Sequence, residues 1–328
     1  MEESQILLSI IIPAFNAEKY VEKCISRIIP VLENDIECII VDDGSIDNTL
    51  KLLKAFSVDI FNIKIISQDN TGVSGARNTA LSNAKGIYTC CIDIDDNIDT
   101  IVFGKTIEYL RNNLFEELVI FPHYEGNKKS GFYLKRQLLP EGKSTDLSAL
   151  YSATFTQKLN EPWKKIYRTD ILHNNNVNFP ISMYMGEDIC MFVDYLQYIH
   201  SYSYVNLPYY YYNKNDNSAS ARVKTSFIEQ EMKLYSYLND YIYRYSLDKS
   251  LDVENKRLFL HKITRYVEIL MEQKVSKQEI RMAIVQSGAE NRIKQTKYIN
   301  KVDLVRKWLL VNHKYFILAV ILKIFKGK

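Results

Sequence analysis

Short aliphatic runs alternate with amphipathic segments through the N-terminal third of the chain. The runs occupy residues 7–12, 36–41, 63–67 and 87–92, and their length and branched side chains are typical of strands buried on both faces. Between the first two runs, apolar residues recur at three- and four-residue spacing, which predicts an amphipathic helix. Strands and helices in this alternation predict βαβ units, and therefore an α/β fold with a mainly parallel sheet.

Local signals add detail to this prediction. Pro13 is expected to end the first strand, because proline cannot donate to a ladder, and Asn16 is expected to cap the helix that follows. A helix is predicted at 49–56 and a fifth strand at 118–121, whereas residues 122–160 show no regular pattern.

The later part of the chain changes character. It predicts a helix that opens at 185–188 and runs to about 200, and a strand over 204–212, and from residue 226 onward the pattern is helical. We therefore expect an α/β domain at 1–222 and a helical C-terminal region at 223–328.

Polar segments follow all four predicted strands, beginning near Pro13, Asp43, Asn70 and Asp95. Because βαβ crossovers are right-handed, the carboxyl ends of parallel strands meet at one edge of the sheet. Ligands of open α/β sheets bind at that edge. The four polar segments are therefore expected to form one site.

The fourth of these segments is strongly acidic. Asp93, Asp95 and Asp96 place three carboxylates within four positions directly after a predicted buried strand. Such a group cannot lie in a core, because unpaired buried charges cost too much free energy. Carboxylate oxygens suit a hard divalent cation. The alternative for this segment alone is a solvated turn that only ends a strand.

Charge is unevenly distributed along the chain. The net charge is +3, but residues 291–328 carry ten Lys or Arg against one acidic residue, and the first 290 residues carry 32 basic and 38 acidic groups. A basic tail on a mildly acidic body suggests a partner with negative charge. The five cysteines predict reduced, buried thiols and a cytosolic protein, and the N-terminus does not resemble a signal peptide.

The tail is also apolar from 308 to 325, with polar interruptions. Its longest unbroken apolar run, 315–322, is far shorter than the ~20 residues needed to span a bilayer. Apolar groups flanked by Lys and Arg predict a helix lying in a membrane interface. The alternative is a helix docked on the protein's own core. Nucleic acid is not expected as a partner. A surface that binds nucleic acid would carry a basic stripe without the apolar residues that accompany the basic ones here.

Five short motifs occur in order, and together they resemble glycosyltransferase family 2, the inverting enzymes with the GT-A, Rossmann-like fold. They are Ile10-Ile11-Ile12-Pro13-Ala14-Phe15-Asn16, Val41-Asp42-Asp43-Gly44-Ser45, Gly72-Val73-Ser74-Gly75-Ala76-Arg77-Asn78, Asp93-Ile94-Asp95-Asp96 and Glu187-Asp188. The resemblance implies transfer of a sugar from a nucleotide-diphosphate sugar, a UDP-sugar first of all, with Mn²⁺ or Mg²⁺ as cofactor.

The resemblance also implies roles for individual residues. Asp43 would accept the N–H of uracil, with Pro13 and Ala14 lining the base; the alternative for Asp43 is a turn residue. Arg77 would reach the diphosphate, or else be a surface charge on a helix. Asp95 and Asp96 would hold the metal. The full set expected to bind the nucleotide-sugar is Pro13, Ala14, Asn16, Asp43, Arg77, Asp93 and Asp95.

On the acceptor side, the reaction needs a general base to remove a proton from the attacking hydroxyl. The resemblance gives this role to Asp188, with Glu187 as its orienting neighbour; alternatively both acids merely favour a helix N-terminus. Trp163 is expected either to form a wall for the acceptor sugar or to pack in the core.

The implied setting is the cytoplasmic face of the cell membrane, where the protein would be peripheral and would meet a glycan or lipid-linked acceptor in surface polysaccharide synthesis. Two other functions remain open: a catalytically silent nucleotide- or sugar-binding protein, and a nucleotidyltransferase. A nucleotidyltransferase would usually have a glycine- and basic-rich loop after the first strand, where this chain has Pro13-Ala14-Phe15-Asn16. No G-x-G-x-x-G follows that strand, which disfavours a dinucleotide dehydrogenase.

Overall fold

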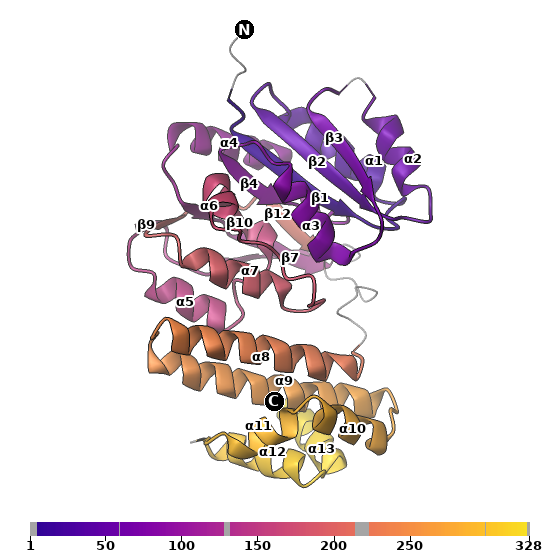
Figure 1. The fold of residues 1–328 in the computed structure, drawn as a ribbon, viewed down its shortest axis with the longest axis vertical. Helices are drawn as coiled ribbons and strands as arrows, with labels where there is room; N and C mark the ends of the chain where they lie inside the picture. The colour runs from indigo at the N-terminus through magenta and orange to yellow at the C-terminus, as the bar shows by residue number, and fades with distance from the viewer. Residues whose placement is uncertain (1–4, 59, 128–131, 214–222, 299, 327–328) are drawn as a thin grey trace. The chain divides into compact units, whose positions relative to one another are not determined.

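The computed structural model describes residues 5–58, 60–127, 132–213, 223–298 and 300–326 (Figure 1). The chain divides into two compact units, Met1–Asn215 and Asp216–Lys328. The boundary expected between 222 and 223 adjoins residues 214–222, which lie outside the described residues.

The first unit is built around a central β-sheet. Its first four strands are β1 (Leu8–Ala14), β2 (Ile36–Asp43), β3 (Ile63–Gln68) and β4 (Tyr88–Cys91). They pair in parallel in the order β3-β2-β1-β4, so the parallel sheet predicted from the aliphatic runs is confirmed here. The helices between them are α1 (Val21–Ile28), α2 (Thr49–Phe56) and α3 (Gly72–Ser82), with a short 3₁₀ turn at Ile29–Val31.

Beyond β4 the same sheet is mixed. The order continues β10-β6-β11-β9, with β10 antiparallel to both β4 and β6. The bounds are β6 (Leu118–Ile120), β9 (Gly142–Ser144), β10 (Lys165–Arg168) and β11 (Tyr202–Tyr204). The helices of this part are α4 (Thr100–Asn112), α5 (Ser148–Phe155), α6 (Thr169–Asn174) and α7 (Glu187–Leu196), with a 3₁₀ turn at Pro162–Lys164.

A smaller second sheet was not predicted. It consists of β5 (Asn97–Ile98), β12 (Tyr210–Asn213), β7 (His123–Asn127) and β8 (Phe132–Arg136), in that order. The expectation that 122–160 is irregular is therefore wrong, since β7, β8, β9 and α5 lie there. The single strand expected over 204–212 is instead two strands, β11 and β12, which belong to different sheets.

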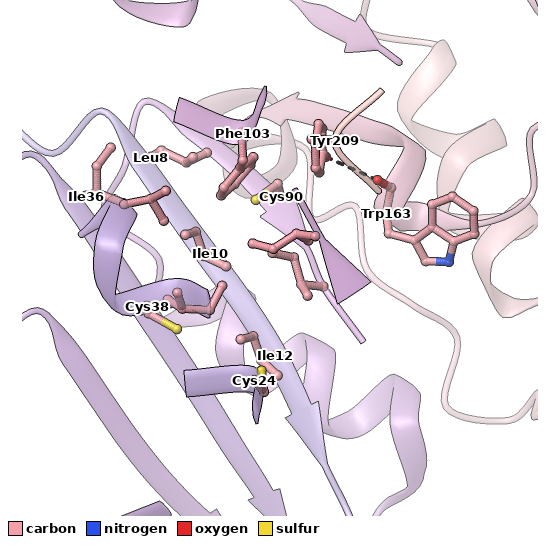
Figure 2. Close-up of a cluster of buried hydrophobic side chains, with 14 of the residues drawn as sticks. Leu8, Ile10, Ile12, Cys24, Ile36, Cys38, Cys90, Phe103, Trp163 and Tyr209 are labelled. Carbon is pink, nitrogen blue, oxygen red and sulfur yellow. Dashed lines mark hydrogen bonds between the residues drawn. The ribbon is translucent and has the colours of Figure 1, made fainter. Parts of the chain in front are cut away.

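The hydrophobic core lies on both faces of the central sheet. Figure 2 shows Leu8, Ile10 and Ile12 of β1 beside Cys38 and Cys90 on one face. Ile11, the residue between them in alternation, belongs to the cluster on the other face, where α3 packs on β1 and β2. All five cysteines are buried free thiols, as predicted. Burial on both faces makes the sheet a rigid support for the loops at its carboxyl edge.

Two local predictions about the first strand are corrected. Pro13 does not end β1; it lies within the strand, opposite Val41 of β2. The pairing of β1 with β4 stops at Ile11, so the N–H that proline lacks has no neighbouring strand on that side. Asn16 does not cap a helix either. Helix α1 begins only at Val21, and Tyr20 occupies its N-cap position.

The second unit is helical, as predicted from its pattern. Its helices are α8 (Ser226–Arg244), α9 (Lys249–Glu272), α10 (Lys277–Gln286), α11 (Ala289–Gln295), α12 (Lys301–Val311) and α13 (Tyr315–Lys326). The long helices α8 and α9 pack along each other, and α12 and α13 both contact α9 (Figure 1). In the part of the chain that is described, none of the helices combines the length and apolarity that a membrane span requires.

Candidate active site

Arg77 lies at the centre of a cluster of carboxylates. It projects from α3 and is only 4% exposed. Its Nη2 is 2.9 Å from Asp93 Oδ1 and its Nη1 is 2.8 Å from Asp188 Oδ1. Glu187 Oε1 is 3.7 Å from the same Nη1. The alternative of a surface charge is excluded, and a buried guanidinium joins the acidic turn after β4 to the start of α7.

Asp188 and Glu187 occupy the first turn of α7. The helix starts after Gly186, whose φ of 86° is a left-handed conformation that glycine adopts easily. Burial raises the pKa of Asp188 to about 7, since it outweighs the opposing effect of Arg77, and the charges of Glu187 and Asp93 add to the rise. Burial likewise raises the pKa of Glu187. In the described residues, Asp188 Oδ2 has no protein partner, which leaves it able to accept a proton.

Lys165 is a second buried cation near this cluster. It is fully buried on β10, and its Nζ donates to the carbonyls of Leu159 at 2.7 Å and Glu161 at 3.0 Å. Burial, followed by repulsion from Lys164, lowers its pKa to about 7. Its positive charge opposes the rise in the pKa of Asp188. Lys165 was not among the residues predicted for the site.

Asp43 ends β2, is buried, and accepts hydrogen bonds from residues between the end of β3 and the start of α3. Its carboxylate accepts from the backbone N–H of Thr71 at 3.0 Å and of Gly72 at 2.8 Å, and from Gln68 Nε2 at 2.7 Å. Gly44 follows with a φ of 72°, and a Cβ there would lie 2.9 Å from the backbone nitrogen of Asn70. Asp43 therefore holds the loop that leads into α3, and through that helix it supports Arg77.

The acidic turn presents its three carboxylates differently. Asp93 is paired with Arg77, and Asp96 Oδ2 accepts a 2.7 Å hydrogen bond from the Tyr210 hydroxyl. Asp95 is exposed, and its carboxylate has no ion pair or hydrogen bond with another described side chain. Its local surroundings still raise its pKa, first by desolvation and then by the negative charge of Asp93.

This donor set bears on the expected metal. Among the described residues, no three His, Cys, Asp or Glu side chains are grouped closely enough to hold an ion by themselves. Asp95 and Asp96 nevertheless offer oxygen ligands where negative charge accumulates. They fit a hard cation such as Mg²⁺, which commonly takes one or two carboxylates and fills its shell with water and substrate phosphates.

Trp163 does not form an open wall. It is 2% exposed, and its ring stacks on Tyr210 with the centroids 4.2 Å apart and the planes 2° from parallel. His123 and Tyr212 contact the same ring, and the Tyr209 hydroxyl donates to the Trp163 carbonyl (Figure 2). A ring covered in this way cannot offer its face to an acceptor sugar, so the core alternative applies to Trp163.

The residues expected around the uracil base lie at or just after the ends of β1 and β2. Pro13 and Ala14 close β1, and Ala14 is opposite Asp42 in the register. Asn16 joins the two loops: its Oδ1 accepts from the N–H of Ile46 at 3.0 Å. Asp42 is 1% exposed, and its Oδ1 is a buried oxygen that has no hydrogen-bond partner among the described residues. Asp42 lies in the second of the five motifs, but no role was predicted for it.

The structure therefore brings together Arg77, Asp93, Glu187 and Asp188 by direct contact, and Tyr210 ties Asp96 to Asp93. Asp43 is linked to this cluster only through its loop and α3. Tyr210 could not have been found from sequence, because its partners lie more than a hundred residues away in the chain.

Comparisons with known proteins identify the family of the chain. A family model described as Glycosyl transferase family 2 matches residues 9–178. The chain is 29% identical over 187 residues to the uncharacterized glycosyltransferase EpsJ of Bacillus subtilis, covering 56% of this chain and 54% of that one. It thus spans about half the length of EpsJ. A chondroitin synthase of Escherichia coli is 34% identical over 108 residues, which is 33% of this chain and 16% of that protein.

Solved structures show the same fold at low sequence identity. Residues 1–349 of S. aureus TarS superpose with a TM-score of 0.58 at 18% identity, covering 90% of this chain and 93% of that one. The expected GT-A fold, a mainly parallel sheet followed by a helical C-terminal region, is confirmed. The family model covers more than half of the chain, and the acidic turn, Asp43 and Arg77 all lie inside the matched range, so the chain belongs to glycosyl transferase family 2.

Proposed function

We propose that this chain is an inverting glycosyltransferase that moves a sugar from a UDP-sugar to an acceptor hydroxyl. The observation that carries the proposal is the buried guanidinium of Arg77, which contacts both Asp93 and Asp188. Asp93 belongs to the acidic turn expected to face the donor, and Asp188 is the expected base on the acceptor side. The Arg77 guanidinium would thereby fix the donor side of the site relative to the acceptor side.

Asp188 would act as the general base. A base works best when its pKa lies near the working pH, and the pKa of Asp188 is raised to about 7. As the acceptor oxygen bonds to the anomeric carbon, its proton passes to Asp188. The bond from that carbon to the diphosphate oxygen breaks on the opposite face, and UDP leaves with the bonding electrons. A single displacement inverts the anomeric centre, so an α-linked donor gives a β-linked product.

The remaining residues would bind and orient the donor. Pro13, Ala14 and Asn16 would border the uracil base of the donor. Asp43 would act by holding the loop that leads into α3. Bound Mn²⁺ or Mg²⁺, held by Asp95 and Asp96, would offset the charge of the diphosphate leaving group. The TarS fragment in complex with UDP-GlcNAc, at a TM-score of 0.58, supports UDP as the nucleotide. Arg77 would then be a positioning residue rather than a diphosphate ligand, because carboxylates occupy its Nη atoms.

The acceptor in this proposal is a glycan or a lipid-linked glycan, used in polysaccharide synthesis. Similarity to a chondroitin synthase over part of the chain supports a polysaccharide product. Such an acceptor would be met at a membrane surface, and the second unit supports attachment there. The outward side of α12 exposes Val302, Val305 and Trp308, the last of these 57% exposed.

The experiment that tests the proposal is a screen of nucleotide sugars for binding, with Mn²⁺ and with EDTA, followed by transfer assays with the donors that bind. A UDP-sugar that binds only with metal, and is consumed to give UDP in the presence of an acceptor, is the expected result. Binding without any turnover or donor hydrolysis would favour a silent binding protein. Release of pyrophosphate from a nucleoside triphosphate would favour a nucleotidyltransferase.

A further inference from the structure

One buried phenol connects the second sheet to the acidic turn. The Tyr210 hydroxyl donates to Asp96 Oδ2 at 2.7 Å and accepts from the backbone N–H of Asp93 at 3.3 Å. A single oxygen thus contacts both ends of the turn 93–96. Because the second bond goes to the backbone, it restrains the path of the chain as well as the direction of a side chain.

The strand that carries Tyr210 also grips the segment just after the turn. In the antiparallel register of β12 and β5, Tyr210 lies opposite Ile98 and Tyr211 opposite Asn97. The N–H of Asp99 donates to the carbonyl of Tyr209 at 2.7 Å. The segment after the turn is therefore held by strand pairing, and the phenol joins the two ends of the turn itself.

The phenol itself has little freedom to move. Tyr210 is 1% exposed and stacks on Trp163, which is 2% exposed and flanked by His123 and Tyr212. Parallel aromatic rings in this packing resist rotation, because turning either ring would open a void. A tyrosine hydroxyl ordinarily keeps its proton at neutral pH, so that of Tyr210 can donate to Asp96.

We propose that Tyr210 is the positioning residue of the acidic turn, and that it holds Asp96 in the orientation in which this carboxylate binds a divalent cation together with the donor diphosphate. The inference rests on the proposed function. It assigns a task to the aromatic stack of Trp163, Tyr210 and Tyr212: the stack fixes an outer partner of the cation's ligand. Outer partners of this kind commonly change metal affinity by about 10- to 100-fold when removed.

The test compares Tyr210→Phe with Tyr209→Phe. Both changes remove one buried phenol hydroxyl from neighbouring positions, but Tyr209 donates to the Trp163 carbonyl and not to the turn. The full chain is titrated with UDP in Mn²⁺ and in EDTA. Tyr210→Phe is expected to weaken UDP binding about 10- to 100-fold in Mn²⁺ and to leave the binding in EDTA unchanged. Tyr209→Phe is expected to behave like the unmodified protein.

Hydrogen exchange of the ligand-free protein gives a second readout that needs no donor. Peptides covering 93–97 should exchange faster in Tyr210→Phe only, since the Asp93 N–H loses its acceptor. Unchanged exchange, or equal losses of UDP binding in both variants, would overturn the positioning role. If the unmodified protein bound no UDP with Mn²⁺, the proposed function would fail instead, so the two failures are distinguishable.

Discussion

Arg77 Nη1 lies 2.8 Å from Asp188 Oδ1, although 111 residues separate them in the chain. The other end of the same guanidinium is 2.9 Å from Asp93. Because the guanidinium is buried, neither carboxylate can move away without weakening the pairing of that charge, and an unpaired charge is costly in a protein interior. Arg77 therefore supports both Asp188, the proposed general base, and the acidic turn.

Asp188→Asn should abolish most of the transfer and leave donor binding nearly intact. The amide cannot accept the acceptor's proton, and general bases typically contribute about 10²- to 10⁴-fold to a rate. The measurement is kcat for transfer beside the dissociation constant of UDP in Mn²⁺. Asp194→Asn, the same change farther along α7, serves as the control and should leave both values unchanged. Normal turnover in Asp188→Asn would remove Asp188 from the role of base.

The pH dependence of kcat/KM should follow the ionisation of Asp188. Its pKa is raised to about 7, and only the ionised form can act as base, so activity should rise with pH and level off above that value. The charge of Glu187 contributes to the rise in pKa. Glu187→Gln should therefore lower the pKa of Asp188 and move the acid limb of the profile to lower pH, whatever happens to the maximum rate. A limb that stays in place, or moves to higher pH, would contradict this account.

Asp43→Asn should lower the stability of the ligand-free protein. The carboxylate accepts from the N–H groups of Thr71 and Gly72, and hydrogen bonds to a charged partner contribute roughly 1.5–3 kcal/mol each. An amide retains only one acceptor atom, so a loss of about 2 kcal/mol is expected in urea unfolding. Asp69→Asn, at an exposed position of the same loop, is the matched control. If the only role of Asp43 were to contact the uracil base, the substitution would leave the free energy of unfolding of the ligand-free protein unchanged.

The parts of the fold that sequence analysis predicted well are those whose signal is local. The strands β1 to β4 are buried on both faces and so appear as uninterrupted aliphatic runs, and α2 was predicted with its observed bounds. The second sheet escaped prediction because its strands are short and partly exposed, as in Phe132–Arg136, and because the pairings of β12 with β5 and β7 join segments far apart in the chain. The ladder of β1 shows the same limit: Pro13 is compatible with it only because β4 ends its pairing early.

The candidate site divides along the same line. Short motifs pointed to Arg77, Asp93 and Asp188, but which atoms they would contact depends on α3, β4 and α7 meeting in space. Trp163 could be a sugar platform or a core residue by composition alone, and only the stack on Tyr210 decides between these. Tyr210 lies among many tyrosines, and nothing local distinguishes it from its neighbours.

The two C-terminal helices dock one side and expose the other. Leu309, Leu310 and Leu318 are buried, whereas seven large apolar residues are exposed among those of this segment whose burial is described. These are Val302, Leu304, Val305, Trp308, Phe316, Ile317 and Val320. The helices therefore pack on the unit's own core, as one of the two alternatives drawn from the sequence expected. They also leave apolar residues exposed, as are Lys297, Lys301 and Lys314, so the expected position in a membrane interface stays a prediction.

This outward surface should bind anionic vesicles. Val305→Ser with Trp308→Ser is expected to reduce the fraction that sediments with phosphatidylglycerol-containing vesicles at low salt, because less apolar surface enters the interface. Tyr243→Ser with Val253→Ser is the matched control, since both are exposed residues of the same unit on α8 and α9. Added salt should also weaken binding, since each lysine near an anionic surface contributes about 1 kcal/mol that salt screens. An unmodified protein that remained in the supernatant at low salt would refute membrane attachment while leaving the transfer chemistry untouched.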